Sequence, residues 1–109
     1  MRTPALLVSV ALCAAASAAC AAQGEEAARA RIDWYVAAAC EALGHDSAMD
    51  EAGRAIMARM ERLGTEVVPE EMDRIAAVLA SETEADERAA AFYCGQKADE
   101  TRSAYGTAE

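Results

Sequence analysis

The chain has 109 residues, with 10 basic and 19 acidic side chains and a formal net charge of −9 at pH 7. This length is enough for one domain. The acidic balance argues against nucleic acid and anionic membrane surfaces as partners, since both require a basic surface. The partners that remain compatible with this charge are basic proteins and cations. Alternatively, the acidic surface binds no partner and is only solvated.

The first 22 residues have the pattern of a secretory signal peptide. A basic residue at position 2 precedes an apolar stretch at 5–16, and small residues with an Ala-x-Ala cleavage option at 19–21 follow. Two alternatives remain open, an uncleaved anchor and a lipoprotein modified at Cys20. We predict a signal peptide at 1–22 and a helical domain at 23–109, in a periplasmic or secreted protein. Under either alternative the protein would be tethered to the membrane.

Two of the four cysteines, Cys40 and Cys94, lie beyond the predicted signal peptide. An even pair in an oxidising compartment predicts one disulfide, with two buried free thiols as the alternative. The bond would close a loop of about 55 residues, for which the chain-entropy estimate is about 4 kcal/mol. That is a large share of the stability of a domain of this size.

The first predicted helix begins near Gln23 and stops at Gly44, a residue typical of helix C-termini. Its large apolar residues recur at helical spacing and define one buried face. This face comprises Ile32, Tyr35, Val36, Ala39, Cys40 and Leu43.

The second predicted helix covers residues 48–63, after a capping box at Ser47 and Asp50, and ends at Gly64. Its apolar face comprises Met49, Ala52, Gly53, Ile56, Met60 and Leu63. Met57 lies beside this face, and we predict that it is an exposed contact with a partner, because methionine makes adaptable binding surfaces.

The third predicted helix begins at Pro69, which suits a first helical turn, and ends near Ala80. A capping box at 81–84 predicts the start of a fourth helix that runs to Tyr105. The apolar residues of the third helix are Met72, Ile75, Ala76 and Leu79, and those of the fourth are Ala91, Cys94, Ala98, Thr101 and Tyr105. Gly95 costs helix stability, so we expect a neighbouring backbone to approach it closely.

No segment of the sequence alternates as a β-strand does, and no repeat is present. The predicted fold is all-α, a small four-helix bundle whose first and last helices are joined by one disulfide. Many core positions are alanine, which predicts a thin core. Four aromatic residues lie near the cysteines in sequence, and we expect some of Trp34, Tyr35, Phe92 and Tyr93 to pack around the disulfide.

The sequence contains no catalytic, cofactor-binding or metal-binding motif. His45, the one histidine, stands in a Gly-His-Asp-Ser segment typical of a solvated turn. Asp46, Asp50 and Glu51 lack the alternating acids and central glycine of a calcium loop. We predict no catalytic residue, no cofactor and no metal ligand.

A signal peptide followed by a small helical domain with one widely spaced cysteine pair resembles families of small bacterial periplasmic proteins. Cys40-Glu41 after an aromatic residue, and Cys94 with Gln96 and Lys97, are similar to features of the periplasmic acid-stress chaperones. That resemblance implies a small disulfide-linked helical protein, and no functional residue is carried over from it.

These observations favour a non-enzymatic protein that acts by protein–protein contact, as an accessory, an inhibitor or a chaperone-like factor. An acid-stress chaperone is one alternative, since most carboxylates become neutral near about pH 3 and a thin core loosens. A small metal-dependent hydrolase and a lipid-anchored envelope protein are the others.

Overall fold

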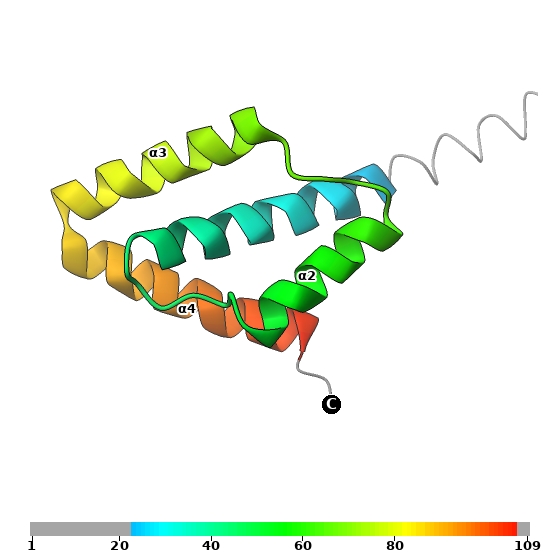
Figure 1. Cartoon of the computed structure of the whole chain (residues 1–109). Coiled ribbons are helices and arrows are strands. Elements are labelled where there is room, and N and C mark those ends of the chain that lie inside the picture. Colours follow the sequence, from blue (N-terminus) through cyan, green and yellow to red (C-terminus); the bar gives the residue numbers. More distant parts are fainter. Residues whose placement is uncertain (1–22, 107–109) are drawn as a thin grey trace, which may run out of the picture.

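The computed structural model describes residues 23–106, which form four helices. The first helix covers 23–42, and α2 (Glu51–Arg62), α3 (Pro69–Ala85) and α4 (Glu87–Tyr105) follow. The first helix packs with α3 and α4, while α2 packs on the first helix and α4 (Figure 1). The predicted all-α bundle is confirmed. The predicted signal peptide and Cys20 lie outside the described residues.

Two glycines end the first helix and α2 as the sequence predicts. Gly44 and Gly64 have φ values of 81° and 70°, in the left-handed region that glycine enters at little cost. The N–H groups of Gly44 and His45 donate to the Glu41 and Cys40 carbonyls at 3.0 and 2.9 Å. This pair of bonds satisfies carbonyls that would otherwise lack partners at the helix end.

The predicted start of the second helix is wrong by three residues. Asp50, and not Ser47, is the N-cap of α2, because its Oδ1 accepts a hydrogen bond from the Ala52 N–H at 3.2 Å. Residues 45–50 instead form a turn that lies against α4, where the Ser47 carbonyl accepts a hydrogen bond from Arg102 at 2.7 Å.

The predicted boundary between the third and fourth helices is also wrong. α3 continues through the supposed capping box at 81–84, and Thr83 Oγ1 donates to the Leu79 carbonyl at 2.8 Å, as in a helix interior. The break falls at Asp86, whose backbone is extended and whose Oδ1 accepts from the Ala89 N–H at 3.1 Å. Asp86 is therefore the N-cap of α4.

The disulfide lies at the centre of the largest apolar cluster. Cys40 of the first helix and Cys94 of α4 are joined, with their Cα atoms 5.8 Å apart, and both are almost fully buried. Val36, Ala39 and Leu79 complete the buried part of this cluster. The predicted link between the first and last helices is confirmed.

A second cluster joins the first helix to α2, and its buried members are Ala30, Ile56 and Met60. A third cluster consists of alanine alone, at positions 48, 52 and 98.

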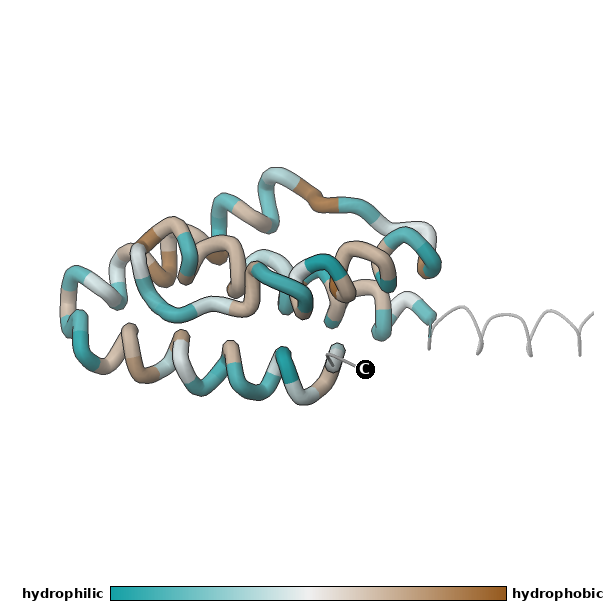
Figure 2. Tube along the Cα trace, turned by 60° about the horizontal axis from the view of Figure 1, so that its bottom comes forward, coloured by the Kyte–Doolittle hydropathy of each residue, from teal (hydrophilic) through white to brown (hydrophobic). Residues whose placement is uncertain are grey.

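Hydrophobic and hydrophilic residues are interspersed along each helix (Figure 2). No helix among residues 23–106 is long and apolar enough to cross a membrane.

The aromatic residues are distributed differently from the sequence prediction. Phe92 is 71% exposed and Tyr93 is 42% exposed, so neither is enclosed around the disulfide. Trp34 packs against the second cluster, whereas Tyr35 is fully buried. Two further predictions are wrong, because the helices are turned about their own axes relative to the predicted faces. Ile32 is 48% exposed, and Ala90 is buried in place of Ala91.

The close backbone approach predicted at Gly95 occurs instead at Gly53. A Cβ atom built on Gly95 meets nothing within 4 Å, whereas one built on Gly53 lies 3.0 Å from the Ala48 carbonyl oxygen. Met49 Sδ and Trp34 Cζ3 are also near it, at 3.6 and 3.7 Å. Gly53 therefore allows α2 to pack closely against the preceding turn.

The two glycines should respond oppositely to alanine. Gly95→Ala should raise the free energy of unfolding by about 0.5–1 kcal/mol, because it lowers the backbone entropy of the unfolded chain and meets no obstacle. Gly53→Ala should lower it by about 1 kcal/mol through crowding against Ala48. Urea unfolding of both variants with the disulfide intact measures the difference; stabilisation by both would contradict the packing at Gly53.

Candidate functional site

His45 lies against α3, and is not the fully solvated turn residue expected from the sequence. Its Nε2 is 3.4 Å from Thr83 Oγ1. The Thr83 hydroxyl already donates its proton to the Leu79 carbonyl, so the histidine acts here as the donor to the hydroxyl oxygen. This arrangement ties the turn to α3 and does not activate the hydroxyl as a nucleophile.

The acids near the same turn surround an arginine. Arg102 Nη2 lies 3.4 Å from Asp46 Oδ1 and 3.6 Å from Asp50 Oδ2, and its Nη1 lies 3.7 Å from Asp99 Oδ1. The guanidinium thus supplies the positive charge that these carboxylates attract. Within residues 23–106 no three histidine, cysteine, aspartate or glutamate side chains are grouped so that they could hold a metal ion.

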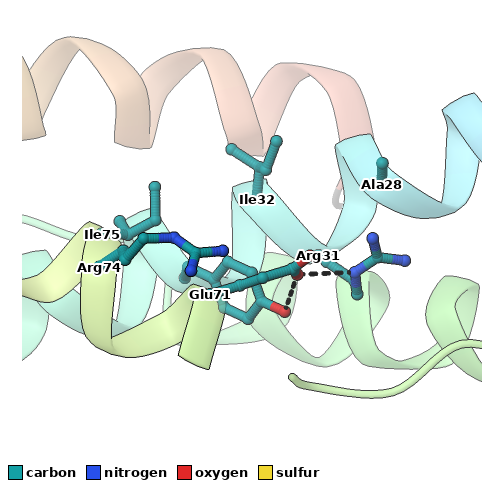
Figure 3. A pocket seen from close by; sticks show the side chains of 7 residues that line it. Ala28, Arg31, Ile32, Glu71, Arg74 and Ile75 are labelled. Carbon is teal, nitrogen blue, oxygen red and sulfur yellow. Dashed lines mark hydrogen bonds and ion pairs between the residues drawn. The ribbon is translucent and has the colours of Figure 1, made fainter. Parts of the chain in front are cut away.

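A polar network fastens the start of α3 to the first helix (Figure 3). Glu71 Oε1 accepts hydrogen bonds from Arg31 Nε at 3.0 Å and from the Tyr35 hydroxyl at 2.7 Å. The same Tyr35 oxygen accepts from the Val68 N–H at 2.9 Å, and Arg31 Nη1 donates to Thr65 Oγ1 at 2.8 Å. The network therefore also holds the connector between α2 and α3.

The charges and burial in this network shift its ionisation. The hydrogen bonds from Tyr35 and Arg31 lower the pKa of Glu71 below its ordinary value of 4.5. Burial, together with the bond to Glu71, raises the pKa of Tyr35 above its ordinary value. At neutral pH Glu71 is therefore an anion with two donors, and Tyr35 is a neutral donor.

The end of α4 is held by polar contacts at the same end of the bundle, because Asp33 lies between Arg31 and Tyr35 on the first helix. The Tyr105 hydroxyl donates to Asp33 Oδ2 at 2.7 Å, and the Arg59 guanidinium lies 4.5 Å from the centroid of the Tyr105 ring. Burial and the bond to Asp33 raise the pKa of Tyr105 well above its ordinary value. These contacts join the end of α4 to the first helix and α2.

Met57, predicted as a partner contact, lies on an open part of α2 and is 43% exposed. It borders two adjacent surface hollows of about 640 and 170 Å³. Their apolar lining includes Trp34, Met49 and Val67. We call this the Met57 surface, with lining residues Trp34, Met49, Asp50, Gly53, Arg54, Met57, Ala58, Met60, Glu61, Thr65, Glu66 and Val67.

A third hollow, of about 300 Å³ and mainly apolar, lies between α3 and α4 beside the first helix. It is lined by Val36, Ile75, Val78, Leu79, Glu82 and Tyr93. Val78 is 59% exposed at its rim. Ile75 also lines the hollow beside Arg31 and Arg74, where it lies near Ile32 (Figure 3), so the two hollows adjoin.

Met57 is exposed as the sequence predicts, and its contact with a partner stays a prediction; the polar network and the exposed Val78 were not predicted. The helical spacing of Arg31 and Tyr35 was a signal for a shared face, but nothing in the sequence paired them with Glu71, 36 positions after Tyr35. No family model, no curated protein and no solved structure matches this chain.

The network at Glu71 should make stability depend on pH. A carboxyl group whose pKa is lowered by folding stabilises the fold above its ordinary pKa, and this contribution is lost as the pH falls through the lowered pKa. Glu71→Gln should therefore unfold at a lower temperature than the wild type at neutral pH, with a gap that closes in acid.

Thermal unfolding followed by circular dichroism, from neutral pH to about pH 3, measures this gap. Glu70→Gln, on the same turn of α3 and exposed, is the matched control and should change little. A gap for Glu71→Gln that stayed constant across the whole range would contradict an ionised Glu71 as the fastening group.

Proposed function

We propose that this protein is non-enzymatic and acts outside the cytoplasm by binding another protein, as an accessory, an inhibitor or a chaperone-like factor. The observation that carries the proposal is the Met57 surface. An exposed, flexible thioether that borders two hollows, which tryptophan, methionine and valine also line, has the composition of an adaptable protein-binding surface.

The charges of the Met57 surface indicate the chemistry of the partner. Glu61 and Glu66 lie on it together with Asp50, which also pairs with Arg102, and Arg54 is the one base among its lining residues. The whole chain is also strongly acidic, with a net charge of −9. A partner segment that carries one or two large apolar side chains flanked by lysine or arginine would complement both features.

The location proposed for this activity is the periplasm or the exterior of the cell. The disulfide supports it, because such bonds persist in oxidising compartments. The proposed signal peptide at 1–22 agrees with it, and lipidation at Cys20 would place the same surface at the membrane.

Replacement of Met57 tests this proposal. Met57→Lys removes the apolar contact and adds a charge of the same sign as the proposed partner segment, whereas Phe92→Lys changes an exposed apolar residue outside the Met57 surface. Each protein is immobilised and exposed to a periplasmic extract, and the retained proteins are compared by mass spectrometry.

We expect a specific partner on the wild type and on Phe92→Lys, and at least about tenfold less of it on Met57→Lys, which corresponds to about 1.4 kcal/mol of binding energy. Retention should fall as salt is added, because the flanking charges are exposed. Equal retention by all three proteins would reject the Met57 surface, and the absence of any retained protein would count against the proposed function.

An acid-responsive chaperone is the second candidate, and Glu71 is the observation that favours it. One carboxylate fastens α3 to the first helix, and only Leu79 of α3 is buried. Protonation would weaken this fastening, while the other carboxylates also lose charge and the protein becomes a polycation. α3 would then separate and expose apolar residues to an unfolding client.

Light scattering of an aggregating client protein near about pH 3 tests the acid chaperone. We expect suppression of scattering in acid and none at neutral pH. Glu71→Gln, which lacks the ionised fastening, should begin to suppress at a higher pH than the wild type. Unchanged scattering in acid would remove this candidate.

A further inference from the structure

One face of α3 carries an exposed apolar residue between two opposite charges. Val78 is 59% exposed, Arg74 lies four residues before it and Glu82 lies four residues after it. Both charged side chains are exposed, and neither forms one of the ion pairs of residues 23–106, although Arg74 lines the hollow beside Glu71 and contributes to the lowered pKa of that carboxyl group. This part of α3 is therefore open to solvent on a helix that contributes one buried residue to the core.

Helical geometry places these three residues symmetrically. At about 100° per residue, Arg74 lies about 40° to one side of Val78 and Glu82 about 40° to the other. The two charges are separated by about 12 Å along the helix axis, with Val78 at the midpoint. Ile75 and Ser81 lie farther out on the two sides, and Glu71 and Ala85 complete the face at its ends.

This face is complementary to itself when it is turned by 180° about Val78. We propose that α3 packs antiparallel against α3 of a second copy of this chain, with a two-fold axis through Val78. Val78 then meets its own copy, and Arg74 meets Glu82 of the second copy at two symmetric places. A two-fold interface requires this kind of match, in which each residue of a contact is repeated with the roles exchanged.

The other residues of the face agree with this arrangement. The rotation places Ile75 level with Ser81, and Glu71, whose carboxylate is bound by Arg31 and Tyr35 of its own chain, level with Ala85. A parallel arrangement would place Arg74 on Arg74 and Glu82 on Glu82, and would be repelled at both ends. The charge pattern thus selects the antiparallel orientation.

The neighbouring surface supplies additional apolar contact. The hollow of about 300 Å³ between α3 and α4 lies beside Val78, and Tyr93 at its edge is 42% exposed. A second α3 would cover part of this hollow. One helix face gives an interface at the small end of the range, below about 1,200 Å², and the net charge of each chain opposes association, so the dimer should be weak.

The dimer does not depend on the proposed function. The Met57 surface consists of residues of the first helix, α2, and the segments before and after α2, and it shares no residue with the α3 face. Loss of partner binding by Met57→Lys and loss of the dimer by an α3 variant are therefore separate results.

Charge reversal at the two ends of the face tests the dimer. Arg74→Glu places acids at both ends of the face, and Glu82→Arg places bases at both ends, so each variant repels its own copy. The double variant Arg74→Glu/Glu82→Arg restores opposite charges with the order reversed. An equimolar mixture of the two single variants also matches, because each end of one chain then faces the opposite charge on the other.

Sedimentation velocity of the exported, disulfide-bonded protein over a wide concentration range measures association. We expect the wild type, the double variant and the mixture to dimerise, and each single variant alone to have a dissociation constant at least about tenfold higher, since two ion pairs become two repulsions. Phe92→Ala, an exposed apolar change on α4 outside the hollow, is the control and should dimerise as the wild type does. Circular dichroism verifies that every variant is folded.

Each possible result decides the proposal. A wild type that remains monomeric at all concentrations overturns the dimer. Dimerisation that is unchanged by Arg74→Glu and by Glu82→Arg assigns the interface to another face. Association of the wild type that the single variants lose, and that neither the double variant nor the mixture recovers, rejects the antiparallel orientation.

Discussion

The fold depends on the covalent link between Cys40 and Cys94. The largest fully buried side chains of the described region are one tyrosine, one isoleucine, one methionine and these two cysteines, and the rest of the core is mainly alanine. Such a core removes little apolar surface from water, and a small domain has little stability to spare. A bond between positions 54 residues apart limits the unfolded chain, which favours the folded state by about 4 kcal/mol. It also fixes the first helix against α4, the pair on which the other helices pack.

Polar contacts fix the positions of the helix ends and of the turn before α2, which the disulfide does not hold. The Glu71 network fastens the start of α3, the ion pairs of Arg102 hold the turn before α2, and Tyr105 joins the end of α4 to Asp33. These contacts lie at the ends of α3 and α4 and before the start of α2, where the alanine-rich core provides little apolar contact. α3 depends most on them, because only Leu79 of that helix is buried. The outer face of α3 therefore remains exposed to solvent. Its attachment to the first helix can also weaken in acid, because the network contains the Glu71 carboxylate.

Local patterns predicted the elements of this fold better than their rotation about their own axes. Glycine positions predicted the ends of the first helix and α2, and the count of cysteines beyond the predicted signal peptide predicted the disulfide, since both depend on nearby residues or on counting. The α3–α4 boundary differs from the prediction because Ser81 and Asp86 are both acceptable N-caps, and in the structure Thr83 bonds to the Leu79 carbonyl and contacts His45, a residue far away in sequence. The exposure of Phe92 was missed because hydrophobicity alone does not say which side of α4 faces the core. The Glu71 network joins positions far apart in sequence, so no local pattern could identify it.

The two surfaces have a joint consequence. They share no residue, so a dimer formed through α3 leaves both Met57 surfaces open. A partner with two basic apolar segments, or several copies of a partner close together, would then meet two binding surfaces held at a fixed separation. The second contact would form at a high effective concentration and strengthen binding without any additional interaction. If the Met57 surface binds such a partner, weak self-association through one helix face would in this way raise the affinity of a small acidic protein.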